Sequence, residues 1–166
     1  ETQHVVTIDG REISYAVTTG TIVLKEESEK QGDKAGESEG EKPKATVFFI
    51  AYRRTDVSDP AKRPLTFSFN GGPGSSSVWL HLGILGPRRV PMGDIGDLPV
   101  PPFRLEPNAH SLLDETDLVF IDPVSTGFSR AGEGEDATKF HGLNEDAKSV
   151  ADFIRLWLVR NDRWLS

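Results

Sequence analysis

The stretch PLTFSFNGGPGSSSVWLHLG, residues 64–83, decides how the rest of the chain is interpreted. A short apolar strand is expected over Leu65–Phe69, and two glycines, a proline and a third glycine follow Asn70. A short helix is expected next, over Ser75–Leu85. Glycines after a strand let a bare backbone N–H approach a substrate, where it can stabilise an oxygen that gains charge during acyl transfer. The lysine that a phosphate-binding loop requires after its last glycine is absent.

Two signatures, in the correct order, resemble the serine carboxypeptidase family. The first is NGGPGSSS at Asn70–Ser77 with LGP at Leu85–Pro87, and the second is DLVFIDPVSTGFSRA at Asp117–Ala131. The resemblance implies an α/β-hydrolase fold and a serine-type carboxypeptidase that releases C-terminal residues from peptides through an acyl-enzyme. Esterases and acyltransferases use the same scaffold and stay open as alternatives.

The resemblance also implies roles for single residues. The N–H of Gly72 would donate to the oxyanion, and Asn70 with the N–H of Gly71 would hold the C-terminal carboxylate of a peptide. A tight turn for the glycines and a capping or turn role for Asn70 are the structural alternatives. Many family members place a carboxylate-binding glutamate where this chain has Ile84, so this half of the carboxylate site departs from the family pattern.

Other side chains near the signatures are weaker candidates. Arg88 and Arg89 could bind a carboxylate, although surface ion pairs are the commoner role of such arginines. Ser129 is the nearest approach to a nucleophile elbow, but the preceding strand does not run straight into its turn. Segment 122–129 is instead expected to rim the active site, because it leaves the carboxyl end of a parallel strand.

The next parts of the family pattern are not found in these 166 residues. In this family the nucleophile serine follows in a G-x-S-x-G turn, and the triad aspartate and histidine come later. We therefore expect the N-terminal portion of a hydrolase that is inactive alone. Its expected partners are the C-terminus of a peptide substrate and the missing C-terminal part of the same hydrolase. A non-catalytic half-chain that binds a complementary chain is the alternative.

The pattern of apolar residues predicts an incomplete α/β domain over residues 1–166, the N-terminal half of an α/β-hydrolase sheet. Antiparallel leading strands come first. Alternating residues on both sides of Asp9-Gly10 predict a hairpin, and Thr46–Arg53 is expected to pair with its second strand. Between these strands, residues 25–44 are almost entirely polar and predict a charged, flexible insert.

A strand, a helix, a strand and a long helix are expected to follow. The apolar run Leu118–Ile121 predicts a central parallel strand buried on both faces, with a further parallel neighbour expected from the missing half. Apolar residues at helical spacing from Leu143 to Leu158 predict an amphipathic helix. Asn144 is expected to cap its start, and Arg160 and Arg163 suit its end.

Composition excludes several classes of function. The net charge is −7, which argues against nucleic acid and anionic membranes as partners. The chain has no cysteine and four histidines without metal-ligand spacing, so we expect neither a metal site nor a cofactor. No apolar run approaches the length of a membrane span. A removed signal peptide would explain the start at Glu1, so a secreted or periplasmic location is expected, with the cytoplasm as the alternative.

Overall fold

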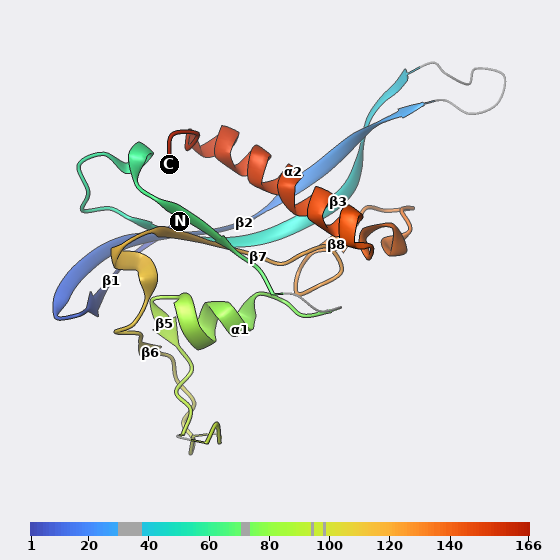
Figure 1. Ribbon diagram of the computed structural model, residues 1–166. Coiled ribbons are helices and arrows are strands. Elements are labelled where there is room, and N and C mark those ends of the chain that lie inside the picture. The colour runs from blue at the N-terminus through green and yellow to red at the C-terminus, as the bar shows by residue number, and fades with distance from the viewer. Residues whose placement is uncertain (30–37, 71–73, 94, 98) are drawn as a thin grey trace.

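The computed structural model describes residues 1–29, 38–70, 74–93, 95–97 and 99–166, which form a twisted main sheet with helices on both faces and a separate two-stranded sheet (Figure 1). The main sheet is six-stranded, in the order β1-β2-β3-β7-β4, with β8 added beside β3. Its strands are β1 (Thr2–Ile8), β2 (Arg11–Glu29), β3 (Ser38–Arg54), β4 (Leu65–Ser68), β7 (Asp117–Ile121) and β8 (Arg130–Ala131). The α/β class and the leading antiparallel strands agree with the sequence prediction.

Two hairpins build the antiparallel half of the sheet. Asp9 and Gly10 take positive φ angles of 46° and 75° in the two-residue turn between β1 and β2, which is the geometry that an Asp-Gly pair favours. Strands β2 and β3 pair along most of their length, from Tyr15↔Arg54 outward. The third strand therefore pairs as the sequence predicted.

The charged segment 25–44 is more regular than the sequence suggests. Pairing of β2 with β3 continues through Lys25↔Pro43 to Glu29↔Ser38, and the ribbon extends beyond the body of the protein (Figure 1). Lys25 and Glu41 lie 3.6 Å apart across it. Backbone pairing needs no apolar side chain, so polar residues can extend a hairpin that apolar residues have begun. The expectation of a loop therefore applies at most to residues 30–37, which lie outside the described residues.

Strand β7 lies inside the sheet, between β3 and β4. It is antiparallel to β3 through Phe49↔Ile121 and parallel to β4 through Ser68↔Phe120. All its residues are buried, as predicted. The expectation that β7 awaits a neighbour from elsewhere is wrong, because β4 fills that place. In the described part of the chain it is β4 that pairs on one side alone.

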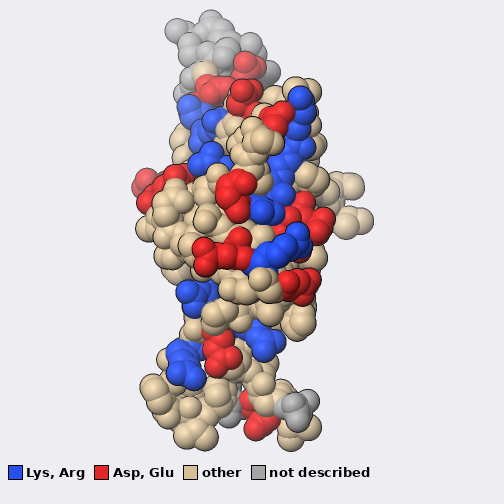
Figure 2. Space-filling model, turned by 90° about the vertical axis from the view of Figure 1, so that its left-hand side faces the viewer, with Lys and Arg blue, Asp and Glu red and all other residues tan. Residues whose placement is uncertain are grey.

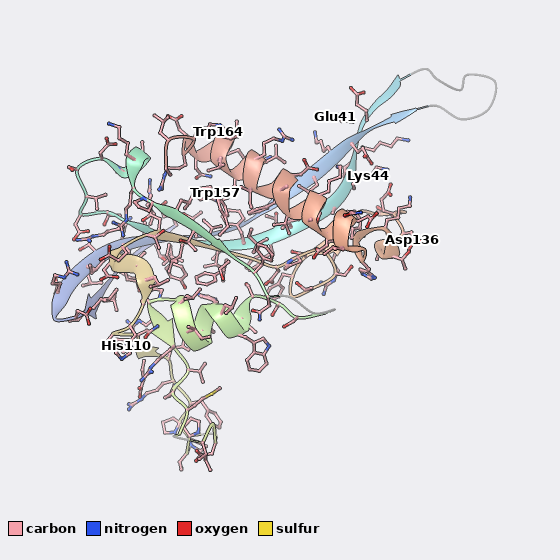
Figure 3. The ribbon with its side chains drawn as sticks, in the orientation of Figure 1. Glu41, Lys44, His110, Asp136, Trp157 and Trp164 are labelled. Atoms are coloured by element: carbon pink, nitrogen blue, oxygen red, sulfur yellow. The ribbon has the colours of Figure 1, made fainter. Side chains whose placement is uncertain are left out.

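Alternate residues of β7 belong to two cores, one on each face. Val119 and Ile121 pack on the side covered by α2 (Leu143–Asn161), whose Phe153 and Trp157 are buried against them. Trp157 meets Phe67 of β4 edge to face, with ring centroids 5.6 Å apart (Figure 3). Leu118 and Phe120 pack on the opposite side with residues of β1, β2 and β3.

The second face is covered by a shorter helix than expected. Helix α1 spans Val78–Leu80 and continues as one π-helical turn, η3 (His81–Leu85), so Ser75 and Ser76 are not helical. The N–H of Gly86 donates to the carbonyl of His81 at 3.0 Å, which closes the wide turn. The remaining short elements are β5 (Arg88–Arg89), β6 (Glu106–Pro107), η2 (Pro60–Lys62), η4 (Leu112–Asp114) and η5 (Ala137–Phe140).

The ends of α2 also differ from expectation. Gly142, and not Asn144, is the N-cap residue, so the first helical turn relies on Glu145 and Asp146 near its positive end. Asp162 ends the helix in the left-handed conformation, with φ 53°. Arg163 then turns back toward the sheet.

Arg163 takes part in a buried ion cluster around Asp117, the first residue of β7. The Asp117 carboxylate accepts from Arg63 Nε at 3.0 Å and from a terminal guanidinium nitrogen of Arg163 at 2.7 Å. It also accepts from the backbone N–H of Arg54 at 3.0 Å. The cluster joins β3, the segment before β4, β7 and the chain after α2.

We predict that Asp117→Asn lowers the free energy of unfolding by about 3–5 kcal/mol, because two largely buried guanidinium groups lose their counter-charge. Urea titration of the wild type and the variant measures this. Asp152→Asn is the control, since Asp152 pairs with the exposed Lys148 and should cost less than about 1 kcal/mol. Equal losses in the two variants would contradict the prediction.

Candidate active site

A cavity of ≈ 700 Å³ opens at the carboxyl ends of β4 and β7. Three stretches line it: the chain after β4, the chain after β7, and the turn that leads into α2. The carboxyl ends of parallel strands are where α/β folds bind ligands. The lining residues are Asn70, Gly74, Pro123, Val124, Ser125, Thr126, Phe140, His141, Gly142, Leu143 and Asp146.

Asn70 is the predicted site residue that the structure places at this cavity. Its Oδ1 is buried and, among the described residues, has no hydrogen-bond partner. A buried amide oxygen without a partner costs stability and needs an explanation, of which a ligand is one. Gly71 and Gly72 lie outside the described residues, so their assigned roles stay predictions.

Asp122, which the sequence analysis did not single out, connects two of the lining stretches. Its Oδ1 accepts from the backbone N–H and the hydroxyl of Ser77, at 2.9 and 3.0 Å. Its Oδ2 accepts from the N–H of Phe128 at 3.2 Å. The signal that could have found it is an acidic residue directly after a buried parallel strand, at the edge where sites form.

Ser129 has a structural role. It is fully buried, and its hydroxyl donates to the carbonyl of Asp122 at 2.6 Å while accepting from the N–H of Phe48 at 2.8 Å. A buried hydroxyl that is already bonded to two backbone groups is not accessible to a substrate, as a nucleophile must be. The prediction that segment 122–129 rims the active site agrees with the structure in that four of its residues, Pro123 to Thr126, line the cavity.

The structure does not bring the other candidates to this cavity. Ile84 lies in η3 with 59% of its surface exposed and is not among the residues that line it. Arg88 contributes to a different cavity of ≈ 330 Å³, together with His4, Tyr15, Val17, Tyr52 and Leu105. Burial raises the pKa of Tyr15, and the hydrogen bond from Arg88 opposes this shift. Arg88 and Arg89 are therefore not placed to bind a ligand beside Asn70.

His81 holds the turn after α1 against the sheet. Its Nε2 lies 2.6 Å from the hydroxyl of Tyr52, and its ring packs on Phe120 with centroids 4.6 Å apart. Burial lowers the pKa of His81 from 6.5 to about 4, partly offset by the charge of Asp122. Burial also raises the pKa of Tyr52. The pair is therefore neutral near pH 7, and its position in the core indicates a structural role.

The side of the protein that Figure 2 shows, which is the left-hand side of Figure 1, carries acidic and basic side chains interspersed. The described residues contain no cluster of three or more histidine and acidic side chains that could hold a metal ion. In the same part of the chain, no helix has the length and apolar character needed to cross a membrane.

Comparison with known proteins identifies the family. The serine carboxypeptidase family model matches residues 34–165, and the chain belongs to this family. Serine carboxypeptidase-like 46 of Arabidopsis thaliana is 31% identical over 131 residues, which cover 75% of this chain. Pheromone-processing carboxypeptidase KEX1 of Saccharomyces cerevisiae is 35% identical over 113 residues, or 64% of this chain.

A solved structure agrees with this assignment. The crystal structure of a prohormone-processing carboxypeptidase from Saccharomyces cerevisiae superposes with a TM-score of 0.58 at 29% identity and covers 86% of this chain. The match extends over 27% of that protein, and the two curated relatives are matched over 24% and 14% of their lengths. The chain therefore corresponds to an incomplete part of an α/β-hydrolase fold.

The buried His81 predicts a loss of stability in acid. Because its pKa is lowered from 6.5 to about 4, the unfolded chain binds a proton in that window that the folded chain does not bind. Stability should be full above pH 6.5 and fall by roughly 3 kcal/mol as the pH approaches 4, then level off. Urea midpoints measured across this range check it.

His81→Gln should flatten this part of the stability profile, since glutamine does not titrate and can still bond to Tyr52. His110→Gln, at an exposed histidine (Figure 3), is the matched control and should keep the wild-type profile. A His81→Gln protein with the same slope as the wild type would show that another group titrates.

Proposed function

We propose that this chain is part of a serine carboxypeptidase that removes C-terminal residues from peptides through an acyl-enzyme. The observation that carries the proposal is the orphan amide oxygen of Asn70 at the cavity beyond β4 and β7, in a chain of this family. An amide can donate to a carboxylate through its NH₂ group and accept from a peptide N–H through its oxygen. Asn70 thus has the chemistry needed to hold the end of a peptide chain.

In the proposed reaction a serine outside this chain attacks the scissile carbonyl, a histidine moves the proton and an aspartate orients the histidine. The N–H of Gly72 stabilises the oxyanion, and the residue after the serine supplies a second donor. Asn70 and the N–H of Gly71 bind the substrate carboxylate. The chain after β7 and the turn before α2 form the surrounding wall. No metal or other cofactor takes part in this scheme.

We propose that the remainder of the hydrolase joins the sheet at β4. Among the described residues this strand pairs with β7 alone, and its other edge carries free backbone groups. Leu65 and Phe67 of this strand are partly buried against the α2 core. A parallel strand added here would carry its own carboxyl end to the Asn70 cavity, where a nucleophile is required.

We further propose a secreted or periplasmic location. Processing of a pheromone and of a prohormone, the tasks named for the yeast relatives, is compatible with a place outside the cytoplasm. Finding the protein in the medium or periplasm of its source, after fractionation against a cytoplasmic marker, would support this location.

An esterase or acyltransferase on the same scaffold is the second candidate. It is favoured by the absence of any acidic residue from Leu80 to Gly86, where many family members carry their carboxylate-binding glutamate. An apolar Ile84 there suits an uncharged substrate better than a peptide carboxylate.

The proposed role of Asn70 predicts which substrates are cleaved more slowly when its side chain is removed. In the complete protein, Asn70→Ala should lower kcat/KM for a blocked dipeptide with a free carboxylate about 10- to 100-fold, the value of a hydrogen bond to a charged group. The corresponding amide and ester should change much less. Asn161→Ala, at the far end of α2, is the control and should leave all three rates unchanged.

Equal losses on acid, amide and ester would contradict carboxylate binding by Asn70. A wild-type protein that cleaves the ester and neither peptide would favour the second candidate. Residues 1–166 alone should turn over none of the three, because the chain lacks the triad.

The Ile84 position can be tested by restoring the family residue. Ile84 is exposed and lies outside the lining of the Asn70 cavity, so we propose that a substrate in the complete protein extends beyond this cavity to reach it. Ile84→Glu should then lower KM for free-carboxylate peptides about three- to tenfold below pH 5, where a protonated carboxyl can donate to the substrate. Amide and ester substrates should be unaffected. Ile95→Glu, at an isoleucine that is 93% exposed, controls for the added charge. The same gain in both variants would show that Ile84 does not face the substrate.

A further inference from the structure

We propose that Asp122 is a positioning residue that fixes two walls of the Asn70 cavity relative to each other, a proposal that rests on the proposed function. A single carboxylate makes the connection, because its two oxygens bind different stretches of chain. Oδ1 binds Ser77 on the side of β4, and Oδ2 binds Phe128 on the side of β7.

The first wall consists of Ser68 to Asn70 and Gly74 to Ser77, on the two sides of residues 71–73, which lie outside the described residues. Ser68 pairs with Phe120 in the sheet, and Ser77 binds the side chain of Asp122 through both its N–H and its hydroxyl. Both ends of this stretch are therefore held by residues two positions apart at the end of β7. A shift of Asp122 would move one end of the stretch while the sheet holds the other.

The second wall is the turn after β7, whose end is hydrogen-bonded to Asp122 at its start. Its N–H groups at Thr126 and Ser129 donate to the carbonyls of Pro123 and Thr126, at 3.0 and 2.9 Å. The hydroxyl of Ser129 donates to the carbonyl of Asp122, and the N–H of Phe128 donates to its carboxylate. Asp122 thus anchors this turn through its main chain and its side chain.

Gly127 shows how closely the turn approaches the carboxylate. It has a φ of +45°, and a Cβ added there would overlap Oδ2 of Asp122. Glycine at this position therefore allows the N–H of the next residue to reach the carboxylate. The three hydrogen bonds in turn stabilise a carboxylate that is only 5% exposed, which would otherwise be costly to bury.

An asparagine at position 122 would keep one acceptor oxygen and replace the other by an NH₂ group, so one wall must lose its bond. A displacement of about 1 Å at a reacting centre costs on the order of 100-fold in rate. Asn70, the proposed carboxylate binder, follows directly on the sheet-bound part of this wall, and the proposed oxyanion donor comes after it in the sequence, toward Ser77. The loss should therefore fall on the transition state more than on the bound product.

The test uses Asp122→Asn in the complete protein. We expect kcat per titrated active site to fall about 10- to 100-fold on peptide and ester substrates alike. Affinity for a peptide boronic acid, which mimics the tetrahedral intermediate, should fall in parallel, while affinity for the peptide product stays within about threefold. Asp136→Asn is the matched control, because Asp136 (labelled in Figure 3) is an exposed carboxylate that accepts from the N–H of Thr138 at 3.0 Å and is not among the residues that line the cavity.

A second measurement does not depend on activity. Hydrogen exchange of the Ser77 and Phe128 amides should be at least tenfold faster at one of the two positions in Asp122→Asn, and unchanged in Asp136→Asn. If Asp122→Asn does not fold, Ser77→Ala tests the proposal instead. This variant removes only the hydrogen bond from the Ser77 hydroxyl to Asp122 and should lower kcat about three- to tenfold.

The outcomes separate this proposal from the proposed function. A wild-type protein that cleaves only esters would remove the carboxypeptidase assignment, while a fall of kcat on the ester in Asp122→Asn would still support the role of Asp122. A folded Asp122→Asn protein with wild-type kcat and boronic acid affinity would overturn it. A wild-type kcat in Ser77→Ala, where Asp122→Asn does not fold, would overturn it equally.

Discussion

Complete burial of β7 is the constraint on which the rest of the structure depends. A strand that meets water on neither face must find partners for all its backbone groups inside the protein, and β3 and β4 supply them. Its side chains must also be covered on both sides, which α2 and the α1–η3 segment do together with the leading strands. The order of the sheet and the positions of both helices follow from these two demands.

The two ends of β7 carry aspartates in different surroundings, one in an ion cluster and one beside the proposed site. Asp117, at the start, is compensated by the full charges of Arg63 and Arg163. Asp122, just past the end, is held by neutral N–H and hydroxyl donors of Ser77 and Phe128. The ion cluster around Asp117 stabilises the contact between several elements. The position of Asp122, by contrast, sets the position of the turns around the cavity in our proposal. The edge at which we propose the active site is thus the one where the aspartate of β7 has, among the described residues, no arginine partner.

Patterns that act locally could be predicted from the sequence. The Asp9-Gly10 hairpin, the buried run Leu118–Ile121 and the amphipathic α2 each depend on neighbouring residues or on a simple period. The expectation of a further neighbour for β7 from the missing half was wrong, because pairing in a sheet depends on topology and no local pattern encodes it. The extent of the β2–β3 ribbon was underestimated, since its outer part is maintained by backbone pairing and not by apolar side chains.

The candidate site likewise combines a feature that a local sequence pattern predicts with contacts that no local pattern predicts. The signature placed Asn70 at the cavity, while the bond between Asp122 and Ser77 joins residues that are 45 positions apart and leaves no local pattern. The π-helical turn η3 could not be predicted, because apolar spacing does not distinguish an α-helical turn from this wider one.

The arrangement of the sheet also sets the order in which the chain can fold. The hairpins β1–β2 and β2–β3 close between neighbours in sequence, and such contacts form within about 1–10 μs. Strand β7 then pairs with β3, from which a long stretch of chain separates it, as in the pair Ala51↔Val119. Closing so large a loop costs conformational entropy. We infer that the finished ribbon acts as a template on which β7 condenses. Until it does, the inner edge of β3 is an open strand that competing chains can occupy.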